Sequence, residues 1–243
     1  MIILSFDSTA KVASVAVADG ERLICEYSID NGLTQSELLL PMAENALKCL
    51  RLDFSDVELL ASSVGPGSFT GVRIGTSLVK GIAFGKNIPC VSVSTLDALA
   101  ENLRGIKGLV VPVMDAKRNQ VYTAIFRSDE NSLVRLCEDK AISIDSLADE
   151  LLSFGEEMVY LVGDGAFVTE RRFKEAYPGV KLSKTPELLI RQSAYSVARV
   201  AYRKYLLGQS ERDTEHMPTY LRLPQAERER LQRLRQEEKN KTE

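Results

Sequence analysis

The feature that most constrains the fold is an internal repeat of strands, turns and a helix. Each copy is predicted to hold an apolar strand that ends at an aspartate, an alternating strand, a third strand and a helix. In the first copy these elements are predicted at 2–6, 12–17, 22–29 and 34–50. In the second copy they are predicted at 109–114, 121–126, 133–138 and 146–154. The shared order indicates duplication, with a chance similarity of two hairpins as the alternative.

The repeat predicts an α/β chain of two halves, residues 1–104 and 105–223. A length of 243 residues is enough for two small cores. The remaining residues, 224–243, form a tail rich in both positive and negative charges, with few apolar residues. We expect this tail to be a solvated helix that frays into disorder, with a binding arm as the alternative.

The two aspartates at the ends of the repeated strands, Asp7 and Asp115, have two interpretations. Carboxylates that face each other across a cleft can hold a metal–phosphate complex. Aspartate side chains also cap tight turns, because they accept hydrogen bonds from nearby backbone N–H groups. The residues by themselves leave both interpretations open.

A glycine-rich segment connects a strand predicted at 57–64 to a helix predicted at about 70–84. Its residues are Gly65, Pro66, Gly67, Ser68, Phe69, Thr70 and Gly71. Backbone N–H groups at such a helix start could hold a phosphate, and Ser68 or Thr70 can cap the helix. The segment lacks the lysine of a P-loop and the third glycine of a dinucleotide-binding loop. It is therefore predicted to begin a helix and to have no catalytic role.

The helices predicted at 34–50 and 70–84 are apolar around a wider arc than a helix lying on one sheet requires. Either both are buried within this subunit, or they share an apolar patch that another protein covers. Glycines in the second helix would permit close approach of another helix. The second interpretation predicts an interface made of Leu38, Leu39, Met42, Ala46, Leu47, Val72, Gly75, Leu78, Val79 and Ile82.

Composition excludes several kinds of chemistry. His216 is the only histidine, so metal sites built on two histidines are impossible, and a Ser-His-Asp triad would need this residue, which lies in a polar segment. The net charge of −3 gives no overall reason to bind nucleic acid or an anionic membrane. No signal peptide or membrane-spanning stretch is evident, so a cytoplasmic protein is expected.

Six segments resemble the TsaB family, also called YeaZ. They are residues 7–9, 35–41, 65–73, 114–122, 163–166 and 218–222. The resemblance covers residues 2–224 and implies a duplicated actin-like fold (ASKHA, ribonuclease H-like) of two mixed sheets flanked by helices. The resemblance also implies that five residues are the remnant of a nucleotide-binding site. These residues are Asp7, Ser8, Asp115, Gly163 and Gly165.

The resemblance also implies a function and partners. Proteins of this family are accessory subunits in forming N6-threonylcarbamoyladenosine beside the anticodon of tRNAs that read codons starting with A. A TsaD-like subunit performs the transfer and holds ATP and metal, and a TsaE-like ATPase joins the complex. The family pairs through the two helices described above, and forms homodimers through much the same surface when alone. No catalytic residue, metal or cofactor is therefore expected on this chain, and tRNA is expected to meet it through the complex.

The sequence departs from the family pattern in two places. Gln35 stands where a histidine is common, and the tail at 224–243 is longer than usual. Two other functions stay open as alternatives. One is an actin-like ATPase or phosphotransferase that uses Asp7, Asp115 and the Gly163 turn. The other is a glycoprotease, an old description of relatives (M22), which would need zinc on histidines that this chain lacks. Some basic residues could contact tRNA or simply form a solvated face. They are Lys117, Arg118, Arg171, Arg172 and Lys174.

Overall fold

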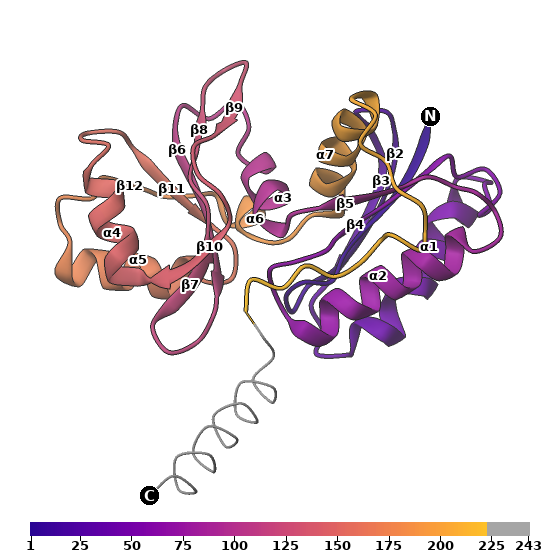
Figure 1. Cartoon of the computed structure of the whole chain (residues 1–243), viewed down its shortest axis with the longest axis horizontal. Helices are drawn as coiled ribbons and strands as arrows, with labels where there is room; N and C mark the ends of the chain where they lie inside the picture. The colour runs from indigo at the N-terminus through magenta and orange to yellow at the C-terminus, as the bar shows by residue number, and fades with distance from the viewer. Residues whose placement is uncertain (223–243) are drawn as a thin grey trace, which may run out of the picture.

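The computed structural model describes residues 1–222, which form two lobes, each built around one sheet (Figure 1). The tail predicted at 224–243 lies outside the described residues. The first sheet has the order β3-β2-β1-β4-β5, in which β1, β2 and β3 are antiparallel neighbours and β4 and β5 run parallel to β1. Its strands are β1 (Ile2–Asp7), β2 (Ala13–Asp19), β3 (Arg22–Ile29), β4 (Leu59–Ser63) and β5 (Cys90–Val93).

The second sheet repeats this order and these strand directions, as β10-β7-β6-β11-β12. Its strands are β6 (Gly108–Asp115), β7 (Gln120–Thr123), β10 (Lys140–Ser143), β11 (Val159–Val162) and β12 (Leu182–Ser183). Asp7 and Asp115 close the equivalent strands β1 and β6. The duplication predicted from the sequence is therefore confirmed, and the fold is the actin-like arrangement of two mixed sheets.

The third strand of the second copy was predicted in the wrong place. The strand equivalent to β3 is β10, whereas β9 (Leu133–Arg135) pairs with β8 (Phe126–Ser128), which itself pairs with β6. The run predicted at 121–126 breaks between β7 and β8. Asp129 accepts hydrogen bonds from the backbone N–H groups of Asn131 and Ser132, and this turn closes an extra hairpin.

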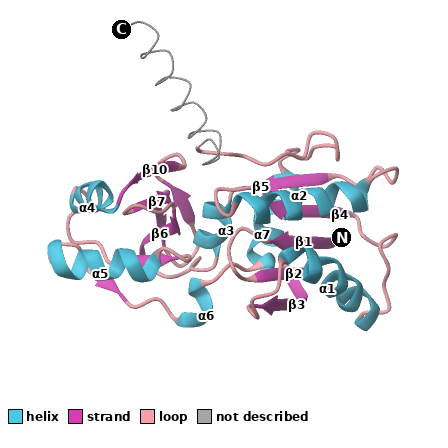
Figure 2. Ribbon diagram, turned by 90° about the horizontal axis from the view of Figure 1, so that it is seen from below, coloured by secondary structure: helices cyan, strands magenta, loops and turns pink. Residues whose placement is uncertain are grey.

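Helices α1 (Gln35–Cys49) and α2 (Phe69–Ala83) cover one face of the first sheet. Thr34 and Glu37 form a capping box at the start of α1. In the second lobe, α4 (Ile144–Leu152) and α5 (Ala166–Ala176) cover the equivalent face, and the short α6 (Glu187–Ile190) lies near the joint between the lobes (Figure 2).

The last helix of each half packs on the sheet of the other half. Helix α3 (Thr95–Glu101) buries Leu96 and Leu99 against Val110 of β6, and α7 (Ala194–Leu206) buries Val197 against the first sheet. The sequence halves 1–104 and 105–223 therefore do not coincide with the two packed lobes. The reason is that each exchanged helix finds its apolar partner surface across the boundary.

After α7 the chain continues along the first lobe as residues 207–222, a segment that we call the C-terminal strap (Figure 1). Glu211 exchanges two backbone hydrogen bonds of 2.9 Å with Cys90, and Thr219 N donates to Val64 O at 2.7 Å. Among the described residues, none of the helices combines the length and the apolar character needed to cross a membrane.

Candidate functional site

The glycine-rich segment packs against the turn that follows β1. Ser68 caps α2 by accepting a hydrogen bond from Gly71 N, as the sequence predicts, and Ser8 Oγ donates to Gly71 O at 2.8 Å. A Cβ on Gly71 would lie 1.9 Å from Ser8 O, and a Cβ on Gly67 would lie 2.5 Å from Thr9 O. These glycines are therefore required by close backbone contact within the chain.

Two backbone donors of this segment are used within the chain. Ser68 N donates to Thr9 O at 2.7 Å, and Gly71 N donates to Ser68 Oγ at 3.2 Å. Gly75, predicted to allow a partner helix to approach, instead faces Ser8, whose Oγ would lie 2.5 Å from an added Cβ. The segment therefore positions α2 on the turn after β1.

Asp7 is turned into the first lobe and is 1% exposed. Its carboxylate accepts hydrogen bonds from Thr9 N at 2.9 Å, Thr9 Oγ1 at 2.7 Å and Ser63 Oγ at 2.6 Å. Burial raises the pKa of Asp7 above its ordinary value, although these hydrogen bonds oppose the shift. This geometry is the turn cap, one of the two interpretations that the sequence left open.

The equivalent corner of the second lobe is more open. Asp115 binds Lys117 through both the backbone N–H and the ammonium group, at 2.8 and 2.7 Å. Asp164 Oδ1 accepts a hydrogen bond from Asp115 N, and burial raises the pKa of Asp164. Gly163 N and Gly165 N donate to Ile190 O and Val113 O. The backbone donors of this glycine turn are therefore also used within the chain.

A cleft of about 370 Å³ lies between the lobes at this corner. Asp115, Gly163 and Asp164 line it, whereas Asp7, Ser8 and Gly165 are not among its lining residues. The structure thus brings only part of the predicted vestigial nucleotide site to one cavity. Within residues 1–222, no three His, Cys, Asp or Glu side chains are grouped so that they could hold a metal ion.

We predict that Asp7→Asn removes a pH dependence of stability. Because burial raises the pKa of folded Asp7, the protonated form contributes stability below the unfolded value of 3.8, and this contribution is lost as the pH rises through the folded pKa. The variant keeps acceptors and donors for Thr9 and Ser63, so its unfolding free energy should decline less over this range. Denaturant unfolding of both proteins at a series of pH values from about 4 upward measures the difference. If the unfolding free energies of the two proteins change with pH in parallel, the prediction is wrong.

Most of the residues predicted to form an interface are buried inside the first lobe instead. The buried ones are Leu39, Met42, Ala46, Leu47, Val72, Gly75, Val79 and Ile82. Six of them belong to the core between these helices and the first sheet, and Gly75 faces Ser8. This burial favours packing within the subunit for these residues. Only Leu38 and Leu78 are half-buried and still reach the surface.

The surface between α1 and α2 is hollowed by a groove of about 530 Å³, which we call the α1/α2 groove. It is lined by Gln35, Ser36, Leu39, Leu40, Phe69, Thr70, Arg73, Ile74, Ser77 and Leu78. Leu40 is 40% exposed. Gln35, the residue that differs from the histidine expected from the resemblance, donates a hydrogen bond to Ala10 O at 2.8 Å. Along α2 the lining residues follow one another at intervals of four, as Phe69, Arg73 and Ser77 and as Ile74 and Leu78. This helical spacing on one face is the sequence signal for the groove.

His216 has a role that the sequence did not predict. Its side chain is fully buried between two strands, with Nε2 2.8 Å from Ser62 Oγ of β4 and Nδ1 2.7 Å from Glu211 Oε1. Ser92 Oγ donates to the same carboxylate at 2.5 Å. The order of groups resembles a catalytic triad, but Ser62 is 1% exposed, so a substrate carbonyl would not reach it. These hydrogen bonds attach the C-terminal strap to the first sheet.

His216→Ala is expected to lower the unfolding free energy by on the order of 3 kcal/mol, because Ser62 and Glu211 lose a buried hydrogen-bond partner. Thr214→Ala is the matched control on the same strap, since this side chain is exposed and should change stability by less than about 0.5 kcal/mol. Equal stability of the two variants in chemical denaturation would show that the histidine does not secure the strap.

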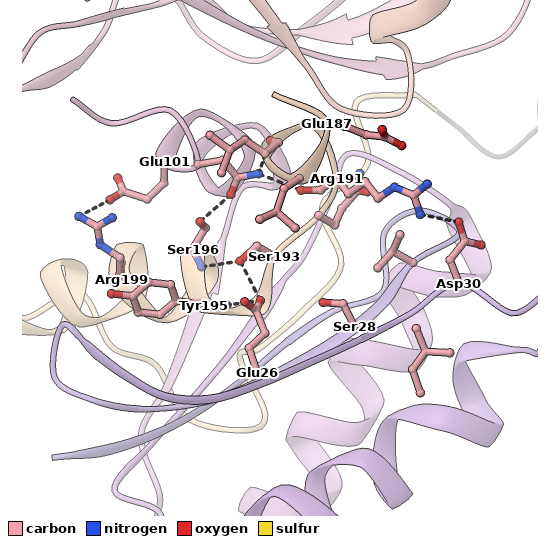
Figure 3. Close-up of a pocket in the computed structure, with 16 residues that line it drawn as sticks. Glu26, Ser28, Asp30, Glu101, Glu187, Arg191, Ser193, Tyr195, Ser196 and Arg199 are labelled. Carbon is pink, nitrogen blue, oxygen red and sulfur yellow. Dashed lines mark hydrogen bonds and ion pairs between the residues drawn. The ribbon is translucent and has the colours of Figure 1, made fainter. Parts of the chain in front are cut away.

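A second cavity between the lobes, of about 660 Å³, is lined by β3, the end of α3, α6 and the start of α7 (Figure 3). Its polar groups are paired with one another. Arg191 contacts Asp30 at 2.9 Å, and Arg199 contacts Glu101 at 3.1 Å. Ser193 Oγ donates to Glu26 at 2.8 Å. The pair of Arg199 and Glu101 joins α7, which packs on the first sheet, to α3, which packs on the second.

The chain is a two-lobed actin-like protein with an open groove between α1 and α2. The glycines of its two glycine-containing turns lie against backbone atoms of neighbouring segments. A family model described as TsaD, tRNA N6-adenosine threonylcarbamoyltransferase, matches residues 34–230. The chain belongs to this family, and within it to the TsaB (YeaZ) group.

The individual relatives agree with this assignment. The tRNA threonylcarbamoyladenosine biosynthesis protein TsaB of Bacillus subtilis is 29% identical over 231 residues, covering 93% of this chain and 96% of the relative. TsaB of Escherichia coli is 29% identical over 230 residues, covering 91% and 95%. The solved structure of YeaZ from Pseudomonas aeruginosa has the same fold, with a TM-score of 0.73, 21% identity and coverage of 90% and 99%.

Proposed function

We propose that this chain is a non-catalytic subunit that binds and activates a TsaD-like threonylcarbamoyltransferase. The product is N6-threonylcarbamoyladenosine beside the anticodon of tRNAs that read codons starting with A. The names of the relatives support the pathway, because both full-length TsaB proteins are described as tRNA threonylcarbamoyladenosine biosynthesis proteins. The single observation that carries the subunit role is the α1/α2 groove.

The groove has the composition of a protein-binding surface. Leu40, Ile74 and Leu78 supply apolar area, and Phe69 and Arg73 at its end are residue types enriched at binding hot spots. Leu33, at 52% exposed, precedes α1, and Phe84, at 79% exposed, follows α2, so large apolar side chains extend the surface beyond both helices. In the absence of the partner, the same surface would pair two copies of this chain.

We further propose that ATP and metal are held by the TsaD-like partner in the cytoplasm, that a TsaE-like ATPase joins through the complex, and that tRNA meets this chain as part of that complex. Support for the cofactor proposal is the internal use of backbone donors in both glycine segments, including Ser68 N and Gly165 N. The inward position of Asp7 also supports it, since an actin-like phosphotransferase needs that carboxylate in the cleft.

Co-expression with a TsaD-like protein tests the function. We expect the two chains to co-purify, and we expect modified nucleoside to form in tRNA only when both chains and the TsaE-like ATPase are present. Calorimetric titration of the isolated chain with ATP and Mg²⁺ tests the alternative. Tight binding with steady hydrolysis by the chain alone, or full tRNA modification without it, would defeat the subunit proposal.

A further inference from the structure

An aromatic and cationic stack lies at the start of α2. The guanidinium of Arg73 lies 3.8 Å from the centroid of the Phe69 ring, and Arg73 Nε donates to the Tyr220 hydroxyl at 2.8 Å. The rings of Phe69 and Tyr220 are 4.9 Å apart and inclined by 30°. Tyr220 is 40% exposed, so the stack is held in place by the C-terminal strap while part of it faces solvent.

The strap continues from this stack to the second lobe. Two residues beyond Tyr220, the guanidinium of Arg222 lies 5.7 Å from the centroid of Tyr122 in β7. Figure 1 shows the end of the strap passing between the start of α2 and β7. The two arginine–aromatic pairs therefore belong to one continuous surface that spans both lobes.

The turn between β6 and β7 adds an unusual backbone to this surface. Lys117, Arg118 and Asn119 have φ values of 63°, 55° and 59°, three successive non-glycine residues in the left-handed region. The equivalent turn after β1 has none. Hydrogen bonds from Ala116 N to Gln120 O and from Ile144 N to Asn119 O hold the turn in this form. Backbone strain of this kind concentrates at ligand-binding segments, and here it exposes Arg118 close to the Tyr122 strand.

Positive charge on this surface comes from Arg73, Arg118 and Arg222, although the chain carries a net charge of −3. Within residues 1–222, no carboxylate forms an ion pair with Arg73, Arg118 or Arg222. Three other basic residues named from the sequence as possible RNA contacts are paired, Lys117 with Asp115, Arg172 with Asp145 and Lys174 with Glu170. Among the described residues, Arg118 and Arg222 therefore have no carboxylate partner that would compete with an anionic ligand.

We propose that the part of this surface outside the α1/α2 groove, made of Arg118, Tyr122, Tyr220 and Arg222, contacts an unpaired stretch of the substrate RNA. The inference rests on the proposed function in tRNA modification. Exposed rings and guanidinium planes stack with bases that have left a helix, and arginines without carboxylate partners bind the phosphates between them. An acidic protein segment would use the arginines but not the exposed ring of Tyr220, and the apolar α1/α2 groove already provides the surface for a protein partner.

The test measures binding of a labelled, unmodified tRNA transcript to the full chain, alone at low salt and in the complex with a TsaD-like protein. We expect Arg118→Glu/Arg222→Glu to weaken binding at least about tenfold in both forms and to reduce the slope of log affinity against log salt by roughly 1.5 to 2. Lys107→Glu is the matched control, because this exposed residue precedes the opposite end of β6, roughly 20 Å away. It should bind tRNA like the parent chain.

Two further measurements separate the possible outcomes. Tyr220→Ala should weaken binding of an RNA hairpin with an unpaired loop more than binding of a fully paired duplex. Co-purification with the partner should be unchanged in Arg118→Glu/Arg222→Glu.

The proposal is overturned if this double variant binds tRNA as tightly as the parent chain, if Lys107→Glu loses as much affinity, or if the double variant loses the protein partner and keeps the RNA. Failure of the parent chain to pair with any TsaD-like protein would instead count against the proposed function, since binding of tRNA to the chain alone is measured separately.

Discussion

Leu78→Glu is expected to abolish pairing with a TsaD-like partner, with a loss of affinity of at least about 100-fold, or roughly 2.7 kcal/mol. Leu78 is half-buried and lines the α1/α2 groove, so a carboxylate there would be desolvated in the complex without a partner. In the free chain the same carboxylate can turn toward water. The thermal unfolding midpoint should therefore stay within a few degrees of that of the parent chain.

The adjacent residue provides the control. Val79 is 0% exposed and packs in the core of the first lobe, so Val79→Glu places a charge where no solvent or counter-charge reaches it. We expect this variant to unfold or aggregate, as measured by circular dichroism and size-exclusion chromatography. If Leu78→Glu binds the partner like the parent chain, or if both variants unfold alike, the groove is not the pairing surface that we propose.

Gly71→Ala is expected to destabilise the protein by more than about 3 kcal/mol. The added Cβ would lie 1.9 Å from the backbone oxygen of Ser8, and backbone on both sides of the contact cannot move independently. Ser8 Oγ also donates to Gly71 O, so separation of the turn after β1 from α2 would break this hydrogen bond as well. The consequence should be loss of the docked α2 and of partner pairing together.

Gly81→Ala is the matched substitution in the same helix. No atom lies within 4 Å of a Cβ added at Gly81, and the residue is exposed. Alanine has a higher helix propensity than glycine, so this variant should be more stable than the parent chain by about 0.5 to 1 kcal/mol. Opposite shifts of the two variants in chemical denaturation would support the close-contact argument. A stable Gly71→Ala protein would contradict it.

The arrangement of the strands was predicted well because its signals are local. An aspartate ends each copy of the first strand, and alternation marks the second, so the duplication at Asp7 and Asp115 is readable from residue order. The third strand of the second copy failed because β10 has only four residues and the run before it forms its own hairpin. Similarly, the start of α2 was predicted from Ser68, whose cap acts within three residues.

The candidate site was predicted less well, because periodicity cannot say what lies against an apolar face. Val79 has the same spacing signal as Leu78, yet the first sheet covers Val79 and leaves Leu78 at the surface. Position in the sequence was equally uninformative for His216. It lies in a polar segment, but the strap places it between Ser62 and Glu211, and Ser62 is distant in the chain.

The glycine-rich segment separates the two kinds of information. Residue types alone predict that residues 65–71 turn and begin a helix, because glycine and a capping serine act through their own backbone neighbourhood. The reason for each glycine is found in long-range packing. Gly67 and Gly71 meet the backbone of the turn after β1, and Gly65 meets Thr219 of the strap, contacts that depend on how distant parts of the chain pack together.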